Sequence, residues 1–229
     1  MRFVGTARDF NWRYAVGEVF LIVIGVTIAL SGSSWYEGRK DLLAEKRILQ
    51  QLHQTLEEDL ADLTRPAEDM QRVERDVTAL LVHLESDKPY IDDLGSYFRS
   101  LGTFRGIRIR SAPFEALKAQ GLDVISDESL RLKLISLYED DFPRLVSSST
   151  IHRTFVQERV SPYLMMNFRQ LESLDWVPHD YERIRSDGYL ANMCRNRLIS
   201  LRKFNLPHYD AAMAAMREIL DDIKSELDD

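Results

Sequence analysis

The stretch Tyr14–Leu30, YAVGEVFLIVIGVTIAL, carries a single charge, Glu18. Apart from that residue, no charged side chain occurs from Tyr14 to Tyr36, an interval of 23 residues. As an α-helix this interval would be about 34 Å long, which matches a bilayer hydrocarbon core of about 30 Å. The sequence therefore predicts a transmembrane helix over residues 14–36. Aromatic side chains that favour the two membrane interfaces lie near both ends: Trp12, Tyr14, Trp35 and Tyr36.

A cleaved signal peptide is the competing interpretation of this stretch. The apolar run Val19–Leu30 has a suitable length, and Ala29-Leu30-Ser31 loosely resembles a cleavage site. Retention is favoured because the charged sequence that follows continues with helical spacing. The chain then divides into a short N-terminal segment (1–13), the transmembrane helix (14–36) and an extramembrane domain (37–229). By local count of basic residues the positive-inside rule is nearly tied between the two flanks. The basic residues after the helix are interleaved with acids, which favours a cytoplasmic N-terminus.

Small residues recur along one face of the predicted transmembrane helix, at spacings of eight, four and four. Membrane helices associate through such small-residue faces because their backbones can approach closely. We therefore expect a homo-oligomer, with ordinary membrane-helix composition as the alternative explanation. The residues of this face are Gly17, Gly25, Ala29 and Ser33.

The acid Glu18 lies about one turn inside the predicted span. A shallow carboxylate can extend toward the lipid headgroups or pair with Arg13. The alternative is a ring of carboxylates in an oligomer, which would bind a cation or conduct ions or protons. Both interpretations stay open at this stage.

The anchor motif also resembles a known family. Tyr14-Ala15-Val16-Gly17-Glu18 is followed by Gly25, by Ile28-Ala29-Leu30, and by Trp35 and Glu37. This order is similar to that of a family of uncharacterised bacterial single-pass membrane proteins, known mainly as a domain of unknown function. Phe114–Gly121 and the stretch from Leu130 to Tyr138 resemble the family too. One departure is Ser33-Ser34, where the family usually has asparagines. The resemblance implies the architecture of a bacterial single-pass membrane protein, and it implies no established activity. In a bacterium, the predicted orientation would place the protein in the inner membrane with its domain in the periplasm.

Beyond the span, the apolar periodicity predicts an all-α helical bundle. Leu42, Leu49, Leu56 and Leu63 recur every seven residues on a helix that we expect to end or kink at Pro66, before a second helix over 67–85. Charged residues at the other heptad positions argue against a clean coiled coil. Further helices are expected near 92–101, 112–120, 127–142, 145–163, 189–203 and 208–227, with no strand pattern of consequence.

The clearest local charge pattern in the domain is a set of arginines within twelve residues that contain no acid. Arginine suits carboxylate or phosphate, so this segment could contact lipid headgroups, an anionic ligand or an acidic partner. The alternative is a solvated or internally salt-bridged loop. The residues are Arg99, Arg105, Arg108 and Arg110.

Several classes of function find no support in the sequence. The net charge of −7 argues against nucleic-acid binding. The five histidines lack metal-ligand spacing, so we expect no metal and no cofactor. No nucleophile or nucleotide motif occurs, and the single cysteine, Cys194, is expected to be a buried residue rather than a nucleophile.

These observations predict a non-enzymatic membrane protein, either a self-associating scaffold or an accessory subunit of a membrane complex. Its partners would be the lipid bilayer, further copies of itself and other subunits of such a complex. Two alternatives remain: an oligomeric pore that uses Glu18, and a periplasmic helical sensor module. The sensor would need a partner for output, because only residues 1–13 precede the span.

Overall fold

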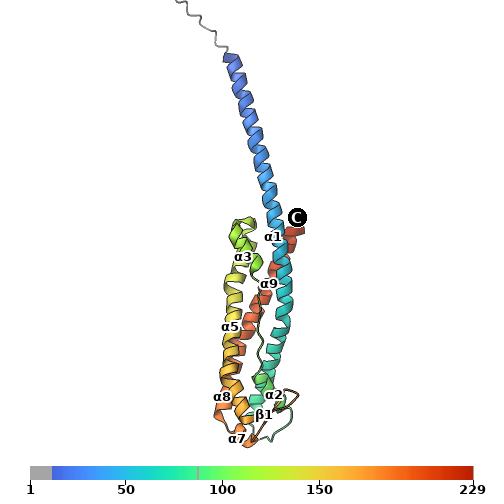
Figure 1. Ribbon diagram of the computed structural model, residues 1–229, viewed down its shortest axis with the longest axis vertical. Coiled ribbons are helices and arrows are strands. Elements are labelled where there is room, and N and C mark those ends of the chain that lie inside the picture. The colour runs from blue at the N-terminus through green and yellow to red at the C-terminus, as the bar shows by residue number, and fades with distance from the viewer. Residues whose placement is uncertain (1–11, 87, 229) are drawn as a thin grey trace, which may run out of the picture. The chain divides into compact units, whose positions relative to one another are not determined.

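The computed structural model describes the backbone of residues 12–86 and 88–228, and the side chains of residues 20–27, 39–86 and 88–228. The all-α prediction is confirmed for this part of the chain (Figure 1). The α-helices are α1 (Trp12–Leu84), α2 (Leu94–Leu101), α3 (Ala112–Gln120), α4 (Glu128–Ser136), α5 (Phe142–Phe155), α6 (Ser161–Asn167), α7 (Tyr181–Arg185), α8 (Gly188–Ser200) and α9 (Leu206–Asp228). A 3₁₀ turn, η1 (Leu122–Val124), and three π turns, η2 (Leu137–Asp141), η3 (Val156–Val160) and η4 (Leu201–Asn205), complete the helical elements.

The chain forms two compact units, Met1–Arg47 and Ile48–Asp229. The second unit is built from three long helical runs: the part of α1 after Arg47, the run α4–η2–α5–η3–α6, and the run α8–η4–α9. Helices α4 and α5 pack along α9. Apolar residues of all three runs form one core, in which Leu56, Leu134 and Ile223 are completely buried.

Three of the four heptad leucines of α1 contribute to this core, whereas Leu42 is 58% exposed. Leu49, Leu56 and Leu63 are at most 1% exposed. They therefore face the helices of their own bundle. In the part of α1 that was predicted as a second helix, Met70, Val77 and Leu84 are buried in the same core.

Proline does not end α1, so the expected helix end at Pro66 and the separate second helix over 67–85 are wrong. The helix continues through this residue to Leu84. A proline inside a helix removes one hydrogen bond and costs about 3 kcal/mol. Its neighbours Leu63 and Ala67 are buried in the core, and this burial offsets the loss.

The breaks expected near Pro143 and between 203 and 208 are wrong for a different reason. Each π turn is followed by one residue and then by a proline: Pro143 after η2, Pro162 after η3 and Pro207 after η4. The residue before each proline donates its N–H to the carbonyl five positions earlier, as in Phe142 to Leu137. The wider turn changes the path of the backbone at the position where a proline ring would clash with an α-helical carbonyl. The helical runs therefore continue past all three prolines.

A short antiparallel hairpin, which the sequence did not predict, follows α6. Strand β1 (Phe168–Gln170) pairs with β2 (Trp176–Pro178), with Phe168 opposite Pro178. Each strand has only three residues, too few to show an alternating pattern. The hairpin packs against α2.

Helix ends near α3 and α4 follow local rules that the sequence does reveal. Helix α3 begins with Ala112-Pro113 and stops at Gly121, whose φ of 106° favours glycine. The Asp127 carboxylate accepts the N–H of Ser129 at 2.7 Å and caps α4.

In the first unit, the side chains of α1 from Phe20 to Val26 are apolar and exposed. Six of them, from Phe20 to Val26, are between 42% and 72% exposed. Within the part of the chain that the structure describes, no helix combines the length and the hydropathy needed to cross a bilayer.

Candidate functional site

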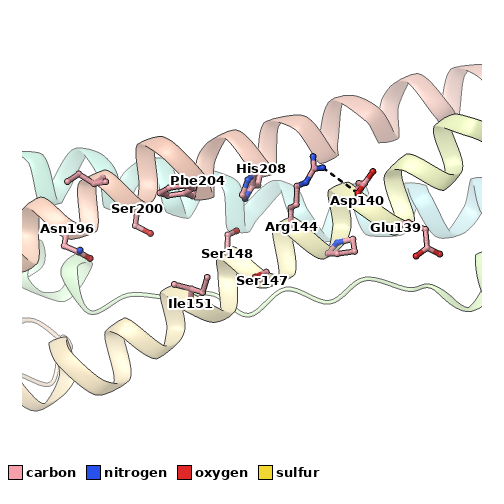
Figure 2. A pocket seen from close by; sticks show the side chains of 12 residues that line it. Glu139, Asp140, Arg144, Ser147, Ser148, Ile151, Asn196, Ser200, Phe204 and His208 are labelled. Carbon is pink, nitrogen blue, oxygen red and sulfur yellow. Dashed lines mark ion pairs between the residues drawn. The ribbon is translucent and has the colours of Figure 1, made fainter.

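A groove of about 640 Å³ lies in the second unit between α5 and the run α8–η4–α9. Figure 2 shows its lining side chains, which come from η2 and α5 in one helical run and from α8, η4 and α9 in the other. We call it the α5–α9 groove. It is lined by Glu139, Asp140, Pro143, Arg144, Ser147, Ser148, Ile151, Asn196, Ile199, Ser200, Phe204 and His208.

Two of the three π turns contribute to this groove. Glu139 and Asp140 belong to η2, and Phe204 belongs to η4. Such turns are frequent at functional sites because they alter which side chains a helix presents. Their position beside the groove therefore marks it as the leading candidate site.

The walls of the groove are apolar and open to solvent. Ile151 is 66% exposed, while Ile199 and Phe204 are each 52% exposed. Exposed apolar side chains gathered in one recess favour binding of an apolar group, whereas scattered ones need no explanation.

The end of the groove formed by η2 carries charges that are compensated within the chain. Arg144 lies 3.6 Å from Asp140 and 3.9 Å from Asp141. Glu139 accepts a hydrogen bond of 2.7 Å from Lys118. These pairs are largely exposed, so each contributes little to stability.

Toward its other end, the groove is lined by uncharged polar groups. The hydroxyl of Ser148 donates to the Leu145 carbonyl at 3.0 Å, and that of Ser200 donates to Asn205 Oδ1 at 3.0 Å. Asn196 adds an exposed amide. Between the two ends, His208 Nδ1 is buried and has no hydrogen-bond partner among the described residues.

Next to this end lies a buried polar cluster centred on Arg197, whose side chain is completely buried. Its Nη1 donates to His152 Nδ1, and its Nη2 donates to the Thr103 carbonyl at 2.6 Å. The Nε atom has no partner in the described part of the chain. No described carboxylate forms an ion pair with this guanidinium. We call Arg197, His152, Asn205 and the Thr103 carbonyl the polar centre.

Electrostatics in the polar centre follow from this burial. Burial, and then the neighbouring Arg197 charge, lower the pKa of His152 to about 3, while Asn205 acts in the opposite direction. His152 is therefore neutral at physiological pH, and its Nδ1 is free to accept from Arg197. Burial also lowers the pKa of Arg197 to about 9, so the guanidinium keeps its charge near neutral pH.

Sequence reasoning missed the polar centre, although one pattern could have revealed it. Leu190, Met193, Cys194 and Leu201 are buried at helical spacings, and Arg197 falls within the same stripe. A basic residue in an otherwise apolar stripe predicts a buried charge. Its pairing with His152 on a distant helix leaves no trace in a single sequence.

The arginines of the predicted basic segment contact the chain itself in three of four cases. Arg99 pairs with Asp175 at 3.1 Å, and Arg105 pairs with Asp69 at 2.7 Å. The third, Arg110, pairs with several carboxylates of α1. Arg108 is exposed and forms no ion pair with any residue that the structure describes. Residues 103–111 lie between α2 and α3 without regular secondary structure.

The contact of Arg110 with α1 is the most buried of these. Asp59 is fully buried in spite of its charge. It accepts the backbone N–H of Arg110 at 3.0 Å and also the guanidinium, while Asp62 accepts Nη2 at 2.8 Å. Burial raises the pKa of Asp59, and the hydrogen bonds from Arg110 oppose this effect. The arginine thus compensates a carboxylate on the apolar face of α1.

The membrane-related predictions fall mostly outside the described side chains. Gly25 is the exception, and a Cβ added there would meet nothing within 4 Å. This face of the helix is therefore open within one chain. The side chains outside the description are those of Trp12, Tyr14, Gly17, Glu18, Ala29, Ser33, Trp35 and Tyr36.

The described residues form no cluster of three or more potential metal ligands. Cys194 is buried, and burial raises the pKa of its thiol to about 12, which disfavours the reactive thiolate. The α5–α9 groove offers hydrogen-bonding groups and apolar walls, so its chemistry is that of a binding site.

Comparison with known protein families, with curated proteins and with solved structures finds no match. The resemblance of the anchor motif to uncharacterised bacterial membrane proteins stays a prediction from sequence.

Proposed function

We propose that this chain is a non-enzymatic single-pass protein of the bacterial inner membrane, which acts as a self-associating scaffold or as an accessory subunit of a membrane complex. Its N-terminus would be cytoplasmic, residues 14–36 would span the bilayer, and the helical domain would lie in the periplasm. The observation that carries the proposal is the exposed apolar helix from Phe20 to Val26.

Successive residues of an α-helix are rotated by about 100°, so four of them already cover its whole circumference. The exposed side chains from Phe20 to Ile24 are apolar without interruption. They therefore leave no polar face for water. A helix that is apolar all round belongs in a protein core or in lipid. The flanking apolar sequence and the aromatic residues at both ends favour lipid.

Self-association is supported by the open face at Gly25, where nothing lies within 4 Å of an added Cβ. A second helix could approach this face closely. The alternative of an ion-conducting pore depends on the sequence position of Glu18 alone, so it ranks below the scaffold.

Alkaline carbonate extraction of cell membranes tests the anchor. We expect the full chain to stay in the membrane pellet and the double variant Ile22→Glu/Ile24→Glu to move to the soluble fraction. Charged residues near the middle of a span each cost a few kcal/mol on insertion, so two are enough to prevent it. The matched control is Leu42→Glu/Leu43→Glu, at positions that are also exposed on α1 and lie outside the proposed span. Extraction of the unaltered chain would contradict the proposal.

A second candidate function is favoured by the α5–α9 groove. Its volume of about 640 Å³ lies within the range of small-molecule sites, and exposed apolar walls accompany it. We propose that the domain binds a small ligand there and so acts as a sensor. Such a sensor would pass its output to a partner protein.

A further inference from the structure

We propose that the α5–α9 groove binds a small organic anion with an apolar body, whose carboxylate or sulfonate lies at the serine end of the groove beside the polar centre. This inference depends on the ligand-binding candidate function above and adds the chemical class of the ligand.

The apolar part of the argument comes from the walls. Ile151 lines the groove from α5 and Phe204 lines it from η4 (Figure 2). Ile199 of α8 lines it as well. All three are more than half exposed. A flat apolar body of one or two rings would cover these side chains and remove apolar surface from water.

The choice of an anion comes from the charge balance around the groove. At the η2 end, Asp140 is paired with Arg144, and Glu139 is paired with Lys118. The guanidinium of Arg197 has no such partner among the described residues, and its Nε makes no hydrogen bond. The serine end therefore lies near an uncompensated positive charge.

This charge acts on the groove through close neighbours. Ser200 follows Arg197 by one turn of α8, and its hydroxyl is bonded to Asn205 of the polar centre. On α5, Ser148 precedes His152 by one turn, and His152 accepts directly from Arg197. Because the interior around Arg197 screens charge far less than water does, its field should extend to both serines. A carboxylate there could also accept hydrogen bonds from Ser147 and Asn196.

At the η2 end the three acids Glu139, Asp140 and Asp141 outnumber the bases Arg144 and Lys118, so this end would oppose a negative group. The ligand would thus be oriented, with its anionic group toward Ser148 and Ser200 and its apolar body along Ile199 and Phe204. A cationic ligand would be repelled by Arg197 at the serine end and attracted by the acids at the η2 end.

Calorimetric titration of the full chain in lipid nanodiscs tests the inference. The probes are naphthalene-2-carboxylate and its neutral analogue naphthalene-2-carboxamide, with empty nanodiscs subtracted. The expected result is about tenfold tighter binding of the carboxylate, a factor that corresponds to about 1.4 kcal/mol. The two probes share size and apolar area, so the ratio isolates the charge.

Two variants connect this ratio to the structure. Arg197→Met keeps a long apolar side chain and should bring carboxylate binding down to the level of the amide. Ile199→Asp places a negative charge in the groove at an exposed position and should abolish the preference for the carboxylate. Its matched control is Leu132→Asp, which makes a similar change on α4 at a side chain 57% exposed and outside the groove. The control should keep the ratio.

Each outcome decides between the proposals. Equal binding of both probes would overturn the anion inference and leave the groove as a binding site. Absence of binding by both probes would overturn the inference together with the sensor candidate, whereas the membrane proposal has its separate extraction test. If Arg197→Met does not fold, as judged by circular dichroism, Ile199→Asp against Leu132→Asp decides. An unchanged ratio in Ile199→Asp would contradict the inference.

Discussion

At the scale of single residues, Arg197 is the most unusual feature of this molecule. A charged side chain that is completely buried normally has an acidic partner, because moving a charge out of water costs several kcal/mol. Here the compensation consists of a neutral imidazole and a backbone carbonyl, from His152 and Thr103. Two dipoles stabilise the guanidinium less than a carboxylate would. The site therefore retains positive potential that can act on a bound group.

His152 makes stability depend on pH. Its pKa of about 3 in the folded chain lies below the ordinary 6.5, so the unfolded chain binds a proton in the interval where the folded chain does not. The contribution is complete above about pH 6.5 and falls as the pH drops toward 3. Between pH 6.5 and 5 we expect a loss of about 2 kcal/mol in the free energy of unfolding from this group.

Urea unfolding of the full chain and of His152→Gln at several pH values measures this loss. The variant should show a correspondingly weaker dependence on pH. The control His179→Gln changes an exposed histidine and should keep the dependence of the unaltered chain. Identical pH profiles for His152→Gln and the unaltered chain would show that this imidazole titrates normally.

Arg110 and Arg108 form a natural pair for comparison, since they lie two residues apart in the same segment. Arg110→Ala leaves the buried Asp59 carboxylate without its guanidinium, and we expect the thermal unfolding midpoint to fall by several degrees. Arg108→Ala removes an exposed side chain without an ion pair to the described residues and should leave the midpoint unchanged. Equal effects would mean that charge in general, and not the contact with Asp59, stabilises the fold.

At the scale of elements, the sequence predicts helices well and their ends unevenly. The stripe of Leu49, Leu56 and Leu63 and the ends of α3 depend on local rules, and both are as predicted. A helix end at Pro66 was predicted wrongly because packing of residues distant in sequence outweighs the local cost of proline. The break at Pro143 was predicted wrongly because a π turn carries the helical run past this proline. A π turn holds one more residue than an α-helical turn, so the apolar residues after it lie at a shifted spacing along the chain. This shift makes one continuous helical run look like two separate helices in the sequence.

For the candidate site, the sequence revealed less. The arginines of segment 103–111 stood out because they cluster along the chain, but Asp69 and Asp59, the partners of Arg105 and Arg110 on α1, are 36 and 51 residues away. The groove combines residues of η2, α5, α8, η4 and α9, and none of these sets forms a motif by itself. Only the tertiary arrangement brings them together.

Pro66 offers a test at this scale. In the structure it lies inside α1 at an intermediate exposure, without a neighbouring π turn. Pro66→Ala restores a helical N–H and removes the steric conflict of the ring, so we expect stabilisation by about 1–3 kcal/mol in urea unfolding. A destabilised variant would show that the bundle requires the bend of a proline at this point.

At the scale of the whole molecule, two surfaces determine what the chain can do. The apolar, exposed helix around Gly25 favours lipid and further helices, whereas the α5–α9 groove favours a small ligand. These surfaces belong to separate units of the chain. Each proposed role can therefore be tested by substitutions that leave the other unit unaltered.

Self-association is tested at Gly25. Because an added side chain meets nothing within 4 Å in one chain, Gly25→Leu should not disturb the helix itself. If copies pack through this face, the variant should raise the dissociation constant in detergent by about tenfold, as measured by analytical ultracentrifugation. Val23→Leu, on the opposite face, is the matched control and should associate like the unaltered chain. An unaffected Gly25→Leu would place the interface elsewhere.

The three π turns, each followed by one residue and a proline, also have a consequence for chain length. A π turn holds one amino acid more than the α-helical turn that it replaces. Deleting that amino acid together with replacement of the proline would restore a regular helix without changing where the run begins and ends. In an alignment with homologous chains, we therefore expect single-residue gaps at η2, η3 and η4, and we expect them to coincide with loss of Pro143, Pro162 or Pro207.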